Sequence, residues 1–269
     1  MDLATLMGLV VGIGLIVGAM LIEVWGSPTM IQDLAVFGSA SSMLIVVGGT
    51  LAAAAVAFRL NEVIRVFTLI KYALTKPKFV LYEIVQEIID LSELNRKGPT
   101  ELEQALPNIK THFLKDGVEF ITQGLKLDDI KEILEQREAF RYYRESHESD
   151  LMKTMGIFAP AFGMVGTLIG LVFMLKEMEK GGSDLAAMVA KKMSVALITT
   201  FYGAIVANLI FNPFAEKIKS RNKENSQAYE LMIEGIVLLY QKKHPLEVRD
   251  KLTAYITPSE RMKYFSDKE

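Results

Sequence analysis

Residues 158–172 read FAPAFGMVGTLIGLV. The stretch is apolar enough to lie in lipid, yet it holds one proline, three glycines and one threonine, and no charged residue. Small residues at this density are typical of membrane helices that pack closely together. A hydroxyl among them can also line a path for ions. The stretch therefore raises two possibilities, helix packing and the wall of an ion pathway.

The rest of the chain separates apolar from charged sequence. The 269 residues are 51% hydrophobic and 23% charged. Four stretches contain no Asp, Glu, Lys, Arg or His: residues 3–22, 34–58, 154–175 and 193–215. Each has the length that a helix needs to cross about 30 Å of hydrocarbon. The first stretch follows Met-Asp without a basic residue, so it is expected to be a retained helix and not a signal peptide. The sequence predicts four transmembrane helices.

Basic residues set the orientation of these helices. Residues 23–33 contain none, whereas residues 59–153 contain fifteen and residues 216–269 contain eleven. Both of these segments, and both termini, are therefore expected in the cytoplasm. Between the third and fourth helices, Ser183 or Asp184 is expected to cap a short amphipathic helix over residues 185–192, at the outer interface.

The cytoplasmic segments show helical periodicity. Val80, Ile84, Ile88 and Leu91 form one apolar stripe, and Gly98-Pro99 separates that helix from the next. The expected fold is an all-α membrane protein with four transmembrane helices, a helical cytoplasmic domain between helices 2 and 3, and a helical C-terminal tail. Its predicted domains are 1–58 (helices 1 and 2), 59–153 (cytoplasmic domain), 154–215 (helices 3 and 4) and 216–269 (cytoplasmic tail).

The sequence lacks the residues that several classes of protein function require. The chain contains no cysteine, and its three histidines are scattered without the spacing of metal ligands. A net charge of −2 gives no indication of nucleic-acid binding. There is neither a phosphate-binding loop nor a Ser-His-Asp set in the sequence. An enzyme is the least favoured class, and no cofactor or resident metal is expected.

None of the four apolar stretches holds an ionisable residue. An ion pathway through a membrane normally needs a carboxylate, because a bare charge at the bilayer centre is costly. Either this protein moves no ions, or another chain supplies the carboxylate.

Two stripes of small residues, one on the third helix and one on the fourth, are relevant to a possible ion pathway. Pro160, Gly163, Thr167 and Gly170 share one face of the third helix, and Ala196, Thr200, Gly203 and Ala207 share one face of the fourth. Packing explains such stripes, including Gly166 beside the first, because small residues let helices approach. Alternatively, the two hydroxyls line a cavity for a partner helix and its carboxylate, with hydroxyl and carbonyl oxygens as ligands for a cation. Pro160 frees a backbone carbonyl one turn earlier, and Pro213 is a second candidate kink.

At these residues the sequence resembles a known family. The segments APAFGMVGTLIGLV (159–172), LITTFYGAIVANLI (197–210) and LIVVGGTLAA (44–53) resemble the flagellar motor stator A-subunits, the MotA/PomA family. The cytoplasmic segment 113–135 and the tail segment 234–261 are also similar to that family. The likeness covers nearly the whole chain, in the right order.

The resemblance implies a function. Members of the family form a ring of five around two copies of a B-subunit, which has one transmembrane helix with an Asp and a peptidoglycan-binding domain. Ion binding and release at that Asp drives rotation of the ring in the bacterial inner membrane, and the cytoplasmic face of the ring turns the rotor. No covalent chemistry is catalysed. The partner's Asp would supply the carboxylate that this chain lacks.

The resemblance also assigns residues. Pro160 and Pro213 match two prolines near the ion path and in coupling, and Thr167 and Thr200 match hydroxyl positions of sodium-driven members. Thr199 would take the role of Thr200 if the register shifted by one. Proton-driven members often have Ala at the first position, so Na⁺ is favoured over H⁺, although a threonine there does not exclude H⁺.

A contact with the rotor switch protein is expected near residues 96–103. Family members carry a basic residue and, about eight positions later, an acidic one. Here RKGPTELE offers Arg96 or Lys97 and then Glu103, one residue shorter than the usual stretch. A solvated charged loop is the plainer interpretation of these residues.

Three other functions compete with the stator. An ExbB/TolQ-type energiser of outer-membrane transport also forms a five-membered ring, but it usually has three spans. A membrane transporter predicts inverted repeats and interrupted helices, and the sequence has no repeat. A structural scaffold predicts that the two threonines can be replaced without loss of function.

Overall fold

The structure, a computed structural model, describes residues 3–75, 78–180 and 185–265. The described residues are mostly helical and include no β-strand, which confirms the predicted fold class. The chain divides into two compact units, residues 1–76 with 146–219 and residues 77–145 with 220–269. Two long helices, α9 (Leu127–Lys180) and α11 (Asn212–Tyr240), contribute residues to both units.

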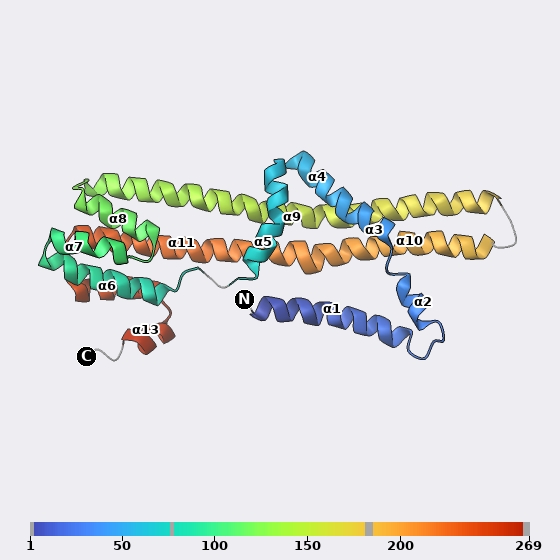
Figure 1. Ribbon diagram of the computed structural model, residues 1–269, viewed down its shortest axis with the longest axis horizontal. Coiled ribbons are helices and arrows are strands. Elements are labelled where there is room, and N and C mark those ends of the chain that lie inside the picture. Colours follow the sequence, from blue (N-terminus) through green and yellow to red (C-terminus); the bar gives the residue numbers. More distant parts are fainter. Residues whose placement is uncertain (1–2, 76–77, 181–184, 266–269) are drawn as a thin grey trace. The chain divides into compact units, whose positions relative to one another are not determined.

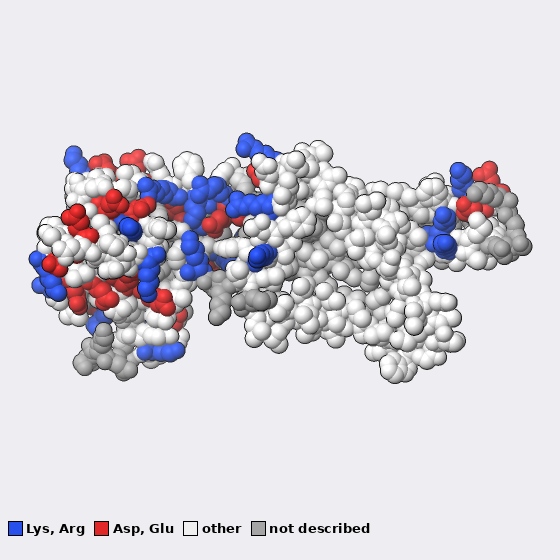
Figure 2. Space-filling model, in the orientation of Figure 1, with Lys and Arg blue, Asp and Glu red and all other residues white. Residues whose placement is uncertain are grey.

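Four helical segments among the described residues are long and apolar enough to cross a membrane, as predicted. They begin with α1 (Leu3–Glu23), which buries none of its residues within this chain. The apolar part of α9 and the helix α10 (Leu185–Ile205) lie side by side (Figure 1). The visible surface of α1, α3 and α4 carries no charged side chain, whereas charges of both signs gather near the α9–α10 connection (Figure 2). This distribution fits apolar elements that face lipid, with a polar end at the α9–α10 connection.

The second span is not the single helix that the sequence predicts for residues 34–58. A short helix α2 (Met30–Ala35) ends before Gly38, and helix resumes as α3 (Ala40–Met43), a π-helical turn η1 (Leu44–Gly48) and α4 (Gly49–Ala57). Ser39 has an extended backbone, and its hydroxyl accepts a hydrogen bond from the Ser42 N–H at 3.3 Å. A serine in this position starts a helix, because it satisfies a donor that has no partner in the first turn. The prediction missed this break.

The connection between the third and fourth spans is also shorter than predicted. Helix α9 continues to Lys180 and α10 begins at Leu185, so residues 185–192 are the first turns of α10 and not a separate interfacial helix. These residues, LAAMVAKK, are mostly strong helix formers and are followed by no breaker, so the helix continues through them. The proposed caps, Ser183 and Asp184, lie outside the described residues.

Proline affects the two long helices differently. Pro160 lies inside α9, which continues unbroken past it. Pro213 follows directly after a π-helical segment, η3 (Val206–Phe211), in the first turn of α11. A proline ring clashes with the carbonyl one turn earlier and has no N–H to donate. A π-type turn before it relieves this conflict and marks a local distortion.

The first unit also has an apolar core of larger side chains. Helix α5 (Leu60–Ala73) buries Val63, Val66 and Leu69 against Met155 of α9 and Phe214 of α11. Polar bonds support the same region: Arg65 pairs with Glu148 at 2.8 Å, and the Ser149 hydroxyl donates to the Ala215 carbonyl at 3.0 Å. These contacts fasten α5 to the paired long helices within this unit.

The second unit is a helical bundle with an aliphatic core. Its helices are α6 (Leu81–Lys97), α7 (Pro99–Ala105), η2 (Leu106–Asn108), α8 (His112–Thr122), α12 (Pro245–Leu252), η4 (Thr253–Tyr255) and α13 (Pro258–Phe265), with parts of α9 and α11. Ile84, Ile88 and Leu91 of the predicted stripe are buried in this core, whereas Val80 precedes α6 and is exposed. Gly98 and Pro99 separate α6 from α7, as predicted.

Candidate functional site

Helices α9 and α10 meet in backbone contact. A Cβ atom on Gly203 would lie 2.8 Å from the carbonyl oxygen of Ala159 and 3.2 Å from the Cα of Gly163. A Cβ on Gly163 would in turn lie 3.2 Å from the Thr199 carbonyl oxygen. Only glycine allows backbones to approach this closely. The two predicted stripes of small residues therefore face each other along a seam.

The seam continues in both directions from this contact. Gly170 lies against Ala196, whose Cβ would be 2.6 Å from an added methyl group, and Gly166 lies against the Thr199 side chain. Ala207 is buried in the first unit. The four glycines predicted to pack these helices lie in the seam, with Gly203 and Gly163 at its tightest point, whereas Ala207 is shown only as part of the buried core.

Thr167 and Thr200 come together across the seam. Their hydroxyl oxygens are 2.5 Å apart, and Thr167 Oγ1 also lies 3.1 Å from the Gly163 carbonyl and 3.2 Å from the Ala196 carbonyl. Thr200 Oγ1 lies 3.3 Å from the same Gly163 carbonyl. Since each hydroxyl has one proton to donate, these contacts are alternatives for that proton. The result is a group of four oxygens, two hydroxyls and two carbonyls.

This oxygen group lies at an open edge of the seam. Thr200 is exposed and Thr167 is half-buried. Ala204 and Asn208, one and two turns further along, are also exposed on the same face, and Asn208 donates from Nδ2 to the Ala204 carbonyl at 3.0 Å. An amide exposed at membrane depth needs protein or water around it, because lipid tails offer no hydrogen bonds. Asn208 was not predicted as a site residue from the sequence, because an amide is not a charged residue and lies outside the two small-residue stripes.

The chemistry available at this edge is cation coordination, not proton transfer by an acid. Hydroxyl and carbonyl oxygens are hard ligands that suit a partly dehydrated cation. They are neutral, and the four apolar stretches contain no Asp, Glu, Lys, Arg or His.

Thr199 lies apart from the pair, although it is the next residue to Thr200. Its hydroxyl donates to the Val195 carbonyl at 2.6 Å and lies 3.2 Å from the Ser42 hydroxyl of α3, and both side chains are fully buried. Consecutive helical residues point about 100° apart, so only one of the two threonines can reach the open edge. The structure brings Thr200, and not Thr199, to Thr167.

Ser42 was not identified from the sequence. Its hydroxyl joins Ser39 at 2.9 Å to Thr199 at 3.2 Å, so it links the start of α3 to α10. Three serines among residues 39–42 are the only signal in the sequence. The single-helix prediction for residues 34–58 hid the helix start that Ser39 caps.

Of the two predicted prolines, Pro160 lies at the tight contact and Pro213 lies in the first turn of α11. Pro160 is half-buried, and its Cα is 3.2 Å from a Cβ built on Gly203. Its missing N–H leaves the carbonyl of Gly156 without the usual helical partner. Pro213 is exposed after the π-helical turn, so it is not part of the oxygen group.

The predicted rotor-facing residues belong to the second unit. Arg96 and Lys97 are exposed in the last turn of α6, and Glu103 is exposed on α7. Gly98 between them has φ of +150°, at the edge of the region that side chains rarely adopt, and Pro99 starts the next helix. Beside them, buried Asn95 donates to the Leu239 carbonyl at 2.6 Å and anchors the end of α6 to α11. The three charged side chains are thus exposed where α6 meets α7, and the Asn95 hydrogen bond holds the end of α6 in place.

Comparisons with known proteins agree with this architecture. A family model described as the MotA/TolQ/ExbB proton channel family matches residues 105–231. Motility protein A of Borreliella burgdorferi is 34% identical over 97% of this chain and 96% of its own length. Chemotaxis protein PomA of Vibrio alginolyticus is 29% identical over 97% of this chain and 98% of its own length.

A solved structure shares the fold. The flagellar MotAB stator complex from Bacillus subtilis contains a chain that superimposes with a TM-score of 0.84, at 23% identity, over 97% of this chain and 99% of that one. Together with the full-length relatives, the four membrane-spanning segments and the paired small-residue stripes, these matches show that the chain belongs to the motility protein A family, within the MotA/TolQ/ExbB proton channel family.

Proposed function

We propose that this protein is the A-subunit of an ion-driven stator of the bacterial flagellar motor. In this proposal it crosses the inner membrane four times with both termini in the cytoplasm. It works with a B-subunit whose transmembrane helix carries an Asp and whose outer domain binds peptidoglycan. Relatives named for motility over nearly the full length of the chain support this assignment.

The observation that carries the proposal is the oxygen group at the open edge of the α9–α10 seam. Thr167 and Thr200 meet there at 2.5 Å with the Gly163 and Ala196 carbonyls beside them. A cation passing this edge would find neutral oxygens on this chain and would need an anionic partner. The Asp of a B-subunit helix placed against Thr200, Ala204 and Asn208 would supply that charge. Binding and release of the ion would then change how strongly the two chains hold each other.

We favour Na⁺ over H⁺ as the transported ion. Two converging hydroxyls and two carbonyls suit a cation that must keep oxygen ligands while it loses water. A proton needs no such set, because it moves along hydrogen bonds. The electrical part of the driving force is about 2.3 kcal/mol per charge for each 100 mV.

The remaining parts follow from this role. Five copies would surround two B-subunits, with residues 154–215 forming the ion path and residues 59–153 the rotor-facing domain. Pro160 and Pro213 would shape the helices that couple ion binding to movement. Arg96, Lys97 and Glu103, exposed at the corner of α6 and α7, would contact the rotor switch protein. Complementary charges suit a contact that must re-form at every step, because they govern orientation and association rate.

The experiment is deletion of the gene, scored by swimming and by the number of flagellar filaments. Cells with normal filaments that cannot swim, and that swim again when the gene is restored, would establish a stator. Sodium titration of the restored cells at constant ionic strength would then identify the ion, with lithium or potassium replacing sodium as the control. Deleted cells that swim normally but take up less of an outer-membrane transporter's substrate would instead assign the ExbB/TolQ-type function.

A further inference from the structure

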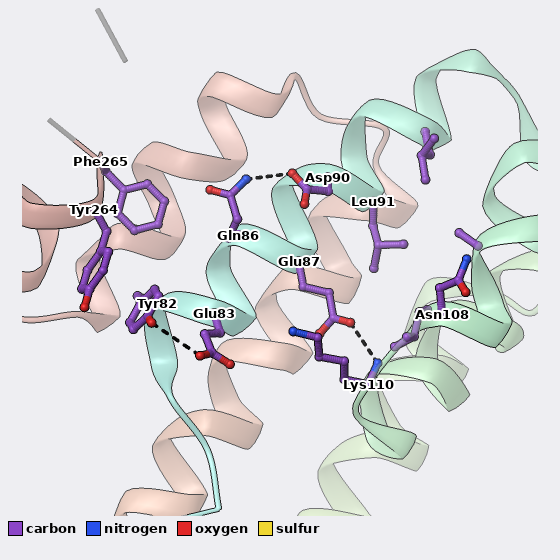
Figure 3. A pocket seen from close by; sticks show the side chains of 13 residues that line it. Tyr82, Glu83, Gln86, Glu87, Asp90, Leu91, Asn108, Lys110, Tyr264 and Phe265 are labelled. Atoms are coloured by element: carbon purple, nitrogen blue, oxygen red, sulfur yellow. Dashed lines mark hydrogen bonds between the residues drawn. The ribbon is translucent and has the colours of Figure 1, made fainter. Parts of the chain in front are cut away.

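A groove lies in the second unit, and none of its lining residues belongs to the α9–α10 seam. It has a volume of about 510 Å³ and runs between α6 and the segment around residues 105–110 (Figure 3). Leu91, Leu94 and Ile109 form an apolar floor. Arg96 and Glu103, the candidate rotor contacts, are not among the residues that line it. The groove is thus a separate feature of the same unit.

Three carboxylates form one wall of the groove. Glu83, Glu87 and Asp90 follow one another at i, i+4 and i+7 on α6, so they lie along one face of that helix. Glu87 accepts from the Lys110 backbone N–H at 2.9 Å, and Asp90 accepts from Gln86 Nε2 at 2.7 Å (Figure 3). These hydrogen bonds come from neutral donors and do not neutralise the carboxylates. Lys110 also lines the groove, so three carboxylates and one ammonium group lie along it. Within the described part of the chain, none of the three forms an ion pair.

The chain's own last described helix closes one end of the groove. The Tyr264 ring of α13 stacks on Tyr82 with centroids 3.8 Å apart and planes 5° from parallel, and Phe265 lies beside it. A side-chain hydrogen bond with Tyr264, followed by burial, raises the pKa of Tyr82. Helix α13 also carries Arg261 and Lys263. Aromatic side chains of α13, a short helix with two basic residues, thus line one end of the groove.

We propose that this groove binds a basic amphipathic helical segment of a partner protein. Leucine-like side chains of such a segment would cover the apolar floor, and Lys or Arg residues one turn apart would meet the three carboxylates. The carboxylate spacing corresponds to rises of about 6 Å and 4.5 Å along α6, which a second helix with basic residues at the same spacing can match. This is the helix-in-groove mode of recognition, with charge complementarity setting the register. The proposal does not depend on the transported ion or on the stator assignment.

The test uses the full-length protein in nanodiscs of zwitterionic lipid. The probe is a short fluorescent peptide of leucine and lysine, with lysines at i, i+4 and i+7, and binding is followed by fluorescence anisotropy. Replacing the groove carboxylates together, as Glu83→Gln, Glu87→Gln and Asp90→Asn, is expected to weaken binding at least about tenfold at low salt. Raising the salt to about 0.5 M should remove most of this difference, because exposed charges are then screened.

The chain offers a matched control with the same charge change and the same spacing. Asp128, Glu132 and Glu135 also lie at i, i+4 and i+7 and are exposed on α9, but they line no part of the groove. Asp128→Asn, Glu132→Gln and Glu135→Gln should leave binding within about twofold of the parent protein. Equal losses in both triple variants, or a parent protein that does not bind the peptide, would overturn the proposal. Displacement of the peptide by millimolar spermidine at constant ionic strength would assign the groove to small polycations instead and would also overturn it.

Discussion

Glycine fills close contacts in both units, but against different kinds of neighbour. In the membrane seam, Gly203 faces the Ala159 carbonyl and the Gly163 backbone. In the second unit, Gly117 of α8 faces the Cδ1 end of Ile236, and Gly235 of α11 faces the Cδ1 end of Ile88 at 2.5 Å from a built Cβ. The first contact joins two backbones, and the second joins a backbone to the tip of a flexible side chain.

This difference follows from the surrounding medium. In lipid, apolar side chains gain little by leaving the hydrocarbon, so helices associate through close packing and hydrogen bonds. In water, burying Ile88 and Ile236 is itself stabilising, by roughly 25 cal/mol for each Å² of apolar surface. The membrane seam therefore depends on how near the backbones come, whereas the second unit depends on how much aliphatic surface it buries.

The largest effect is expected for Gly203→Ala. The added methyl group would be 2.8 Å from a backbone oxygen that cannot move unless α9 and α10 separate. Overpacking of this kind costs about 1–3 kcal/mol, and separation would also break the Thr167–Thr200 contact. We expect loss of swimming and a lower melting temperature in detergent. A variant with unchanged melting temperature and normal swimming would show that the seam is looser than described.

Thr167→Val is expected to impair function more than stability. Valine keeps the shape of threonine but removes the hydroxyl that meets Thr200 and the Ala196 carbonyl. The lost hydrogen bond is worth about 0.6–2 kcal/mol, so the ring should assemble while swimming falls at limiting sodium. The measurement is swimming speed against sodium concentration, with stator assembly followed separately.

Thr199→Val is the matched comparison for that variant. Thr199 is buried and bonds to Ser42 and Val195, away from the open edge. We expect a modest loss of stability, with the sodium concentration for half-maximal speed unchanged. If Thr199→Val shifted that concentration and Thr167→Val did not, the assignment of the ion path to Thr200 and Thr167 would be reversed.

The sequence allowed much of the seam to be predicted, for physical reasons that are local. Thr167 and Thr200 lie on small-residue stripes with helical spacing, and the opposed directions of the two helices bring them to a similar depth. Periodicity could not choose between Thr199 and Thr200, because that choice depends on Ser42, 157 residues earlier in the chain than Thr199. The break before Ser39 was missed for a related reason, since a serine can cap a helix or lie within one.

Gly117→Ala should have a smaller effect, because the neighbour can yield. Alanine improves helix propensity by about 1 kcal/mol, but its methyl group would meet the Ile236 tip. We expect a net loss of about 1–2 kcal/mol in the free energy of unfolding of this unit. Combining it with Ile236→Val, which removes that tip, should recover at least half of the loss, as measured by urea unfolding. A double variant no better than the single one would mean that the backbone, and not the side chain, is the obstacle, as in the membrane seam.

The smallest effect on stability is expected for Arg96→Glu. This variant tests the role of an exposed charge without changing the packing of the second unit. Arg96 is exposed, so reversing its charge should change stability by less than about 0.5 kcal/mol. Its buried neighbour Asn95 donates to the Leu239 carbonyl, which also accepts from the Lys242 N–H. Asn95→Leu should cost about 0.5–1.5 kcal/mol, because it removes one buried hydrogen bond. If Arg96 contacts the rotor, its reversal should lower torque, measured from the rotation of tethered cells, while ion flux through the assembled complex is unchanged. A loss of ion flux in Arg96→Glu would contradict this division, because a change in the second unit would then be acting on the oxygen group of the first unit.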